Sequence, residues 1–141
     1  MRRFLHVLAV AALVLAPWTG SSRATTGSDQ DAAIAAAREW LALIDSGRVS
    51  ESWQASAELF RELRTEQQWA ATVRAIRKPL GEVVKRRLLR VQIRESLPDA
   101  PDGLYVVIEY GTDYERRPGA VEIITPTLEG GAWRVSDYDI R

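Results

Sequence analysis

The chain has 141 residues, 46% of them hydrophobic, and it balances 19 basic against 19 acidic side chains. A chain of this length makes one domain, and its charge balance argues against a general nucleic-acid binder, which needs a dense positive face. Beyond residue 24 it has no Cys and no His, which removes disulfides, the usual zinc and copper ligands and the commonest general base.

The first 24 residues have the form of a secretory signal peptide. A positive N-terminus precedes the apolar run Phe4 to Ala16, which is too short to span a bilayer because a span needs about 20 residues. Small residues in Ser22-Arg23-Ala24 predict cleavage after residue 24, although an uncleaved anchor is an alternative. We therefore expect a periplasmic or secreted protein without a stable membrane anchor. Three arginines leave with the signal, so the single domain at 25–141 keeps 16 basic and 19 acidic residues.

The first predicted helix runs from about Gln30 to Ser46. Ser28 or Asp29 is expected to cap its start, and Gly47 is expected to end it, because glycine is typical just past a helix C-terminus. Apolar residues recur at helical spacing and predict one buried face, made of Ala33, Ala37, Trp40, Leu41 and Ile44.

Two further helices are predicted before the sheet. Ser50 is expected to cap the second, whose buried stripe is Trp53, Ala57, Phe60 and Leu63. Thr65 and Gln68 have the spacing of a capping box that opens the third helix, and Pro79 ends it. The inward face of this third helix is Trp69, Val73 and Ile76. We expect the tryptophans at 40 and 53 to enter the same core.

After Gly81 the apolar period changes from helical to two, which predicts four strands. They are expected at 82–97, 104–114, 120–128 and 132–140. The first should bend near Lys85–Arg87, and Pro126 should weaken the third or mark an edge. This order is typical of an α+β fold, here three N-terminal helices packed on a curved four-stranded antiparallel sheet.

The first predicted strand carries the basic run Lys85-Arg86-Arg87. The run could bind an anion, but we favour a solvated strand face or edge, where charge discourages sheet-to-sheet aggregation. Further along, the period of two predicts one apolar face, formed by Leu89, Val91, Ile93 and Leu97, and one polar face, formed by Arg90, Gln92 and Arg94.

The pairing of the second and third strands is expected to place a carboxylate among apolar side chains. If the hairpin folds near Arg117, Thr112 faces Glu122 and Tyr110 faces Ile124, all on one face of the sheet. The pKa of such a carboxyl is raised unless a cation lies beside it. A one-residue error in register would move it to the other face.

Two more groups are expected near Glu122. Tyr138, on the last strand, lies about one register step away. Arg77 or Lys78, at the end of the third helix, could supply a cation. The functional interpretation is a pocket acid with tyrosine donors. The interpretation that we favour is a structural salt bridge on a partly wet sheet face.

Asp45 also has two interpretations, because an acid in the last turn of a helix opposes the helix dipole. It could be a site carboxylate at the mouth of a pocket. We favour a local role, in which it bonds backbone N–H groups of the following turn or pairs with Arg48.

The chain resembles a family of short bacterial exported proteins catalogued as domain of unknown function 4019. The resemblance covers nearly all of the domain and lies in Trp-Leu-Ala-Leu-Ile-Asp-Ser-Gly at 40–47, Ser-Trp at 52–53, Arg-Lys-Pro-Leu-Gly at 77–81, Pro-Asp-Ala-Pro-Asp-Gly at 98–103, Tyr-Val-Val-Ile-Glu-Tyr at 105–110 and Trp-Arg-Val-Ser at 133–136. The family has no assigned activity, so no catalytic residue is carried over. Its order of elements is similar to the cystatin-like or NTF2-like cone, which often encloses a pocket and whose enzymes often use an Asp–His pair.

These observations predict a non-catalytic exported domain that binds a partner protein in the cell envelope, with no catalytic residue, metal or cofactor. A second hypothesis is a small-molecule carrier with a pocket between helices and sheet, lined by Trp40, Tyr110, Glu122, Trp133, Tyr138, Arg77 and Asp45. A third is a carboxylate-dependent hydrolase or isomerase, since Glu or Asp can do acid–base work alone. A homodimer through the open sheet face is also left open.

Overall fold

The computed structural model describes residues 22–141, in which four helices precede four strands. The elements in chain order are α1 (Ser22–Asp45), α2 (Val49–Ala55), α3 (Glu58–Leu63), α4 (Glu66–Arg77), β1 (Val83–Arg94), β2 (Tyr105–Tyr114), β3 (Arg117–Glu129) and β4 (Ala132–Ile140). The predicted signal segment lies almost wholly outside the described residues, so its cleavage and the limits of the mature domain stay predictions. No helix of this described part is long and apolar enough to cross a membrane.

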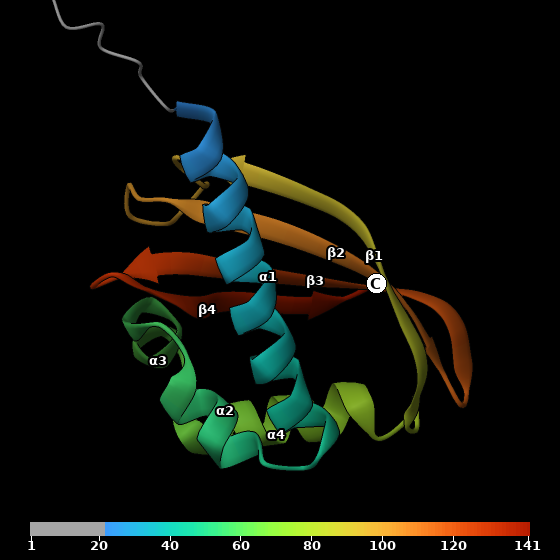
Figure 1. The fold of residues 1–141 in the computed structure, drawn as a ribbon. Coiled ribbons are helices and arrows are strands. Elements are labelled where there is room, and N and C mark those ends of the chain that lie inside the picture. Colours follow the sequence, from blue (N-terminus) through green and yellow to red (C-terminus); the bar gives the residue numbers. More distant parts are fainter. Residues whose placement is uncertain (1–21) are drawn as a thin grey trace, which may run out of the picture.

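The strands form one antiparallel sheet in the order β1-β2-β3-β4, so each strand pairs with its neighbour in the sequence. Figure 1 shows α1 lying across one face of the curved sheet, with the three shorter helices gathered beside its C-terminal half. The predicted α+β class with a four-stranded antiparallel sheet is confirmed. Four helices stand in the described chain where three were predicted, because the second predicted helix is divided.

Helix α1 buries the predicted face, which consists of Ala33, Ala37, Trp40, Leu41 and Ile44. Gly47 follows its end with a φ of +76°, a conformation that glycine adopts without strain. The helix begins at Ser22 rather than at Gln30, so Ser28 and Asp29 lie inside it and the predicted cap is wrong. The added turns contain no proline and a single glycine, which costs about 1 kcal/mol in a helix and does not stop it.

The second predicted helix is broken into α2 and α3 at Ser56 and Ala57. Both residues have extended backbone, with ψ of 162° and 157°. The Ala57 N–H donates to the Val135 carbonyl of β4 at 2.8 Å, which ties the break to the sheet. The break also changes the predicted stripe, because Phe60 stays buried while Leu63 is 63% exposed.

The N-caps of α2 and α4 are formed differently. Arg48 precedes α2 and makes no side-chain capping bond, and the predicted cap Ser50 lies inside the helix. Thr65 and Gln68 form the predicted capping box of α4, in which each side chain bonds the other residue's N–H. The helix then ends before Pro79, as predicted.

The core between α1 and the sheet is aromatic. The ring of Trp40 lies 5.6 Å from that of Trp69 and 5.3 Å from that of Tyr138, and Phe60 meets Trp69 edge-on at 4.9 Å. The buried Trp40 N–H donates to the Ser52 carbonyl at 2.9 Å. Each such ring pair adds about 0.5–1.5 kcal/mol beyond the burial of its area. The space under α1 is therefore filled by side chains.

Strands β2 and β3 pair two residues away from the predicted register. Tyr110, not Thr112, lies opposite Glu122. The difference arises because the hairpin turns at Glu115 and Arg116, the two residues between the end of β2 and the start of β3. A two-residue shift preserves the side on which each side chain lies, so Glu122 shares a face with Thr112 and Tyr110 as expected, and this face is the buried one.

Two irregularities in the pairing of β1 with β2 flank the predicted bend, one between Val83 and Lys85 and one between Leu88 and Arg90. The residue inside the second irregularity, Leu89, is half exposed, although it was predicted to share one apolar face with Val91 and Ile93. Pro126 was predicted to weaken the far end of β3 or to mark an edge there, but β3 lies between β2 and β4, with an irregularity in its pairing at this residue. Such irregularities bend a sheet and strengthen its twist.

The two edge strands of the sheet are covered differently. Strand β4 contacts α1 and α3, and its Val135 carbonyl is paired with the Ala57 N–H outside the sheet. None of the 12 residues of β1 is buried. In the part of the chain that the structure describes, the backbone of β1 pairs with β2 alone. The far side of β1 is therefore a free sheet edge.

Candidate functional site

Glu122 lies on β3 with its carboxylate fully buried on the helix side of the sheet. Arg86 Nε donates to its Oε1 at 2.8 Å, and the Thr112 hydroxyl donates to the same oxygen at 2.6 Å. The Tyr138 hydroxyl donates to Oε2 at 2.6 Å, and Arg77 Nη1 lies 3.4 Å from that oxygen. Each carboxylate oxygen is therefore held by two donors.

Asp45, the last residue of α1, bridges the same two arginines. Arg86 Nη1 donates to Oδ2 at 2.7 Å and Arg86 Nη2 donates to Oδ1 at 3.2 Å, in the fork geometry that guanidinium favours with carboxylates. Arg77 Nη2 donates to Oδ1. We call Asp45, Arg77, Arg86 and Glu122 the charge network. Its formal charges cancel, and it joins α1, α4, β1 and β3.

The ends of two helices position this network. Arg77 lies in the last turn of α4, where a cation is favoured by the helix dipole. Asp45 lies at the end of α1, where a carboxylate is disfavoured by the dipole, so the two arginines compensate it. The Tyr138 hydroxyl also accepts from Arg77 Nη1 at 2.9 Å, which connects β4 to the same group.

The pKa values of the network favour its charged form. Burial alone would raise the pKa of the Glu122 carboxyl, but the hydrogen bond and charge of Arg86, with the Thr112 and Tyr138 hydroxyls, hold that pKa below its usual range. Burial likewise acts on Asp45, and Arg86 and Arg77 together lower the pKa of its carboxyl. Both carboxylates are therefore ionised at neutral pH.

Two tyrosine hydroxyls beside the network are buried without a hydrogen-bond partner among the described residues, those of Tyr110 and Tyr114. The ring of Tyr114 lies under the Arg77 guanidinium, whose central carbon is 5.0 Å from the ring centroid. Burial raises the pKa of the Tyr114 hydroxyl, and the charge of Glu122 raises it further. The Tyr114 hydroxyl is therefore neutral at neutral pH.

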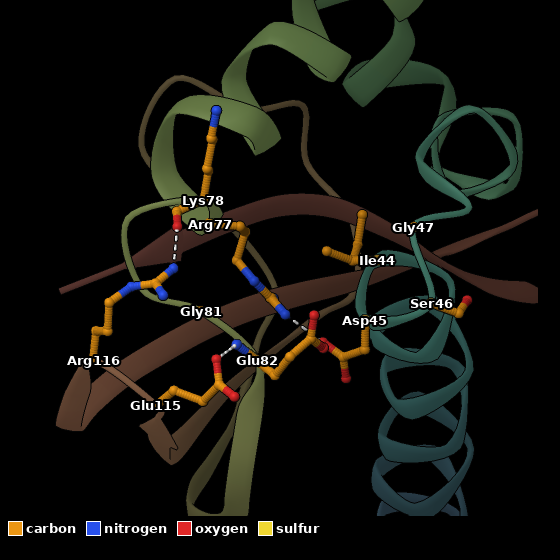
Figure 2. Close-up of a pocket in the computed structure, with 10 residues that line it drawn as sticks. All are labelled: Ile44, Asp45, Ser46, Gly47, Arg77, Lys78, Gly81, Glu82, Glu115 and Arg116. Atoms are coloured by element: carbon orange, nitrogen blue, oxygen red, sulfur yellow. Dashed lines mark hydrogen bonds and ion pairs between the residues drawn. The ribbon is translucent and has the colours of Figure 1, made fainter.

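An open cleft of about 540 Å³ lies where the ends of α1 and α4 meet the turn that joins β2 to β3. Figure 2 shows that the pair Asp45–Arg77 reaches across it and that the Lys78 side chain points away from the other labelled groups. The charged side chains that line it are Asp45, Arg77, Lys78, Glu82, Glu115 and Arg116.

Some of these lining side chains already have structural partners. Arg116 donates to the carbonyls of Pro79 and Lys78 at 2.9 and 2.7 Å, and so completes the C-terminus of α4. Glu115 accepts the Glu82 N–H at 3.0 Å. The lining carries as many cations as carboxylates, which leaves no strong preference for a ligand of one sign.

The structure brings together four of the seven predicted site residues, namely Asp45, Arg77, Glu122 and Tyr138. Trp40 packs against the Tyr138 ring, and Tyr110 lies opposite Glu122 across the sheet. Trp133 is elsewhere, beside a smaller hollow of about 270 Å³ between α1 and β4. Lys78, the alternative cation, does not reach Glu122. The binding role assigned to these residues stays a prediction.

Sequence reasoning missed Arg86, which was counted with the exposed run of β1. The observed pairing places Arg86 opposite Thr112, on the face that also carries Glu122. The inward orientation of Arg86 could not be read from the sequence, because the irregularity at Leu89 breaks the period of two between the start and the end of the strand. The pattern that could have indicated Arg86 is a run of three basic residues whose middle member lies on the same face of the sheet as a buried acid.

The interpretation favoured for Asp45 is wrong. Arg48 pairs with Glu51 on α2 rather than with Asp45. Asp45 instead is the carboxylate at the mouth of a cleft, held by Arg77 and Arg86. Sequence distance explains the error, because both arginines come from elements more than 30 residues away.

This geometry is poorly suited to acid–base catalysis. A general base needs a free lone pair facing the substrate and a pKa near the working pH. Glu122 has neither, because four donors occupy its oxygens and its pKa is lowered. Within residues 22–141, no group of three or more acidic side chains is placed to hold a metal ion.

A family model described as "Protein of unknown function (DUF4019)" matches residues 36–138. This range includes every member of the charge network and all four strands except the last residues of β4. No curated protein and no solved structure matches the chain.

Proposed function

The chain belongs to the family described as Protein of unknown function (DUF4019), and from the geometry of its site we propose that it is a non-catalytic binding domain whose ligand is a segment of another polypeptide. The observation that carries this proposal is the saturation of Glu122, the one fully buried carboxylate among the described residues. All of its donors come from the protein itself, so the group serves the fold rather than a substrate.

The filled interior supports the same proposal. The helices-on-sheet arrangement is similar to the cystatin-like or NTF2-like cone, and we assign the chain to that class as part of this proposal. Cones that carry small molecules need an inner cavity, usually of about 300 Å³ or more. Here Trp40, Trp69 and Tyr138 occupy the space between α1 and the sheet. A ligand would have to bind on the outside.

Export into the periplasm or beyond is the second part of the proposal. It rests on the charged, apolar and small-residue segments of the first 24 residues. N-terminal sequencing of the protein recovered from its host would begin at Thr25 if the signal is cleaved as proposed. An N-terminus at Met1 or Arg2 in a membrane fraction would contradict it.

Site-specific photo-crosslinking in the living host tests the binding function. A photoreactive amino acid is introduced at one exposed position at a time on α1, on β1 and on the turn between β2 and β3, for example at Arg38, Leu89 and Glu115. We expect one face to give a crosslinked product of defined mass that contains a second protein, while the other faces give none. Turnover of a substrate by the purified protein that is lost in Glu122→Gln would overturn the proposal.

The cleft beside Asp45 and Arg77 favours one alternative function, the binding of a small ligand at the mouth of the domain. Native mass spectrometry of protein purified gently from its own host distinguishes the two. Extra mass that disappears on denaturation, and that is absent in Arg77→Met, would favour the small ligand. A bare protein mass would favour the polypeptide partner.

A further inference from the structure

Strand β1 is unlike the other three strands, because its outer edge is free and its faces are only partly covered. None of its 12 residues is buried, whereas β2, β3 and β4 each carry several buried side chains. Among residues 22–141, only β2 pairs with its backbone. A row of unpaired N–H and C=O groups of this kind can pair with a further strand.

Exposed apolar side chains accompany this free edge. Val84 is 70% exposed, Leu89 is 50% exposed and Leu88 is 43% exposed, although Leu88 lies on the helix side of the sheet opposite Tyr110. Helix α1 lies across the sheet but leaves the N-terminal part of β1 uncovered (Figure 1). Three of the five large hydrophobic residues exposed in the described chain therefore belong to one strand.

The charge of β1 has a single sign. The strand contains five basic residues and no acidic one. Arg86 is turned inward to the charge network, while Lys85, Arg87, Arg90 and Arg94 are exposed. Arg87 and Arg90 approach Asp113 and Glu109 of β2 only at 3.8 and 3.9 Å, so these exposed pairs neutralise little of their charge.

This charge decides which strand can occupy the edge. A second copy of the chain would bring two basic β1 strands together, and like charges on facing strands are destabilising. An acidic strand would instead gain attraction along its whole length. Basic residues on an edge also discourage pairing with other sheet edges. They do not discourage pairing with an acidic strand, because opposite charges attract.

We propose that the free edge of β1 binds an extended acidic segment of a partner protein, which adds a fifth strand to the sheet beside β1. The inference rests on the proposed function and names the partner's chemistry. The side chains of an added strand alternate between the two faces. Those on the helix side meet Leu88, and those on the other side meet Arg87, Arg90 and Arg94. The segment therefore alternates apolar and acidic residues.

A synthetic peptide of about ten alternating valine and glutamate residues is a direct probe, because about that length covers a typical strand. Its binding to the purified protein is measured by fluorescence anisotropy, and the site is mapped by amide chemical shifts. We expect saturable binding with shifts in β1. We expect binding about tenfold weaker for a peptide with lysine in place of glutamate, because its charge is reversed. Proline in place of valine should cause a similar loss, because it removes strand donors.

Matched protein variants separate the basic strand from net charge. Neutralising three exposed residues of β1, as Lys85→Gln/Arg90→Gln/Arg94→Gln, should weaken binding about tenfold, and raising salt from about 0.05 M to about 0.5 M should do the same to the wild type. Neutralising Arg38, Arg74 and Arg117, which are exposed on α1, α4 and β3, removes the same charge and should change binding less than about twofold. Equal effects of the two triple variants would overturn the proposal, as would shifts that map away from β1.

Crosslinking separates failure of this inference from failure of the proposed function. A photoreactive group at Leu89 should capture a second protein through an acidic segment, identified by sequencing the crosslinked peptide. Capture from α1 or from the β2–β3 turn alone would agree with the proposed function but contradict the role of β1. Capture of another copy of this chain through β1 would also sink it. The absence of a crosslinked protein from every tested face would contradict both the proposed function and the role of β1.

Discussion

Arg86 and Arg87 are neighbours on β1, yet the fold uses them in opposite ways. Arg86 reaches inward, with its guanidinium between the carboxylates of Asp45 and Glu122 at 2.7 and 2.8 Å. Arg87 lies flat over Gly111 on the outer face, 3.8 Å from Asp113 and about half exposed. The same side chain on the same strand is thus a structural part in one position and a surface charge in the other.

The difference follows from solvent. Water screens the Arg87 pair and supplies other hydrogen bonds, so such a pair contributes about 0–1 kcal/mol. Arg86 is desolvated together with a carboxylate that no water reaches, so each group depends on the other. The buried network stabilises the fold, and the outer charges are available for a partner.

The largest effect is expected from Arg86→Met, which keeps much of the volume of the side chain and removes its charge. Glu122 would then be a buried carboxylate that keeps only Arg77, at 3.4 Å, as a cation partner, and breaking a buried pair in this way costs about 3–5 kcal/mol. Arg87→Met on the next residue should change stability by less than about 0.5 kcal/mol. Urea unfolding followed by tryptophan fluorescence measures both. Equal losses in the two variants would contradict the division between inner and outer charges.

Much of this fold could be predicted from local sequence patterns. The stripe of α1, the capping box at Thr65 and Gln68, and the change of period after Gly81 all depend on neighbouring residues, and all are confirmed. The break at Ala57 could not be predicted, because it depends on a hydrogen bond to Val135, 78 residues away in the chain.

The site was predictable in part for the same reason. The inward orientation of Glu122 follows from the period of two and survives the two-residue error in register. Arg86 was missed because the irregularity at Leu89 shifts the alternation, so residues on either side of it cannot be assigned to a face by counting. Extrapolation from Val91 and Ile93 would place Arg86 on the outer face, which is the wrong one.

A smaller loss is expected from Tyr138→Phe, which keeps the ring and removes the hydroxyl. That hydroxyl donates to Glu122 at 2.6 Å and accepts from Arg77 at 2.9 Å, and hydrogen bonds to charged groups contribute about 1.5–3 kcal/mol. Tyr105→Phe is a suitable comparison, because its hydroxyl donates only to the neutral Pro101 carbonyl, and it should cost about 0.5–1.5 kcal/mol. Thermal unfolding of the two variants ranks them. A larger loss for Tyr105→Phe would show that the network hydroxyl is dispensable.

The network also predicts how acid acts on stability. The folded-state pKa of Glu122 is held below its ordinary value of 4.5, so its contribution is fully present above about that pH and is lost as the pH falls through the lower, folded-state value. Glu122→Gln cannot titrate, so the stability difference between it and the wild type should be greatest at neutral pH and shrink in acid. Glu62→Gln, on the exposed side of α3, should differ little from the wild type at every pH. Urea unfolding at a series of pH values measures the differences, and one that stays constant for Glu122→Gln would contradict the role of the ionised carboxylate.

The smallest effect is expected from Tyr114→Phe, and its sign is the opposite of that for Tyr138→Phe. The Tyr114 hydroxyl is buried and has no hydrogen-bond partner among the described residues, so its removal relieves a desolvated polar group instead of breaking a bond. The ring that lies under Arg77 is kept. We therefore expect stability to stay the same or to rise by up to about 1 kcal/mol. A loss like that of Tyr138→Phe would show that the Tyr114 hydroxyl, and not only its ring under Arg77, takes part in the charge network.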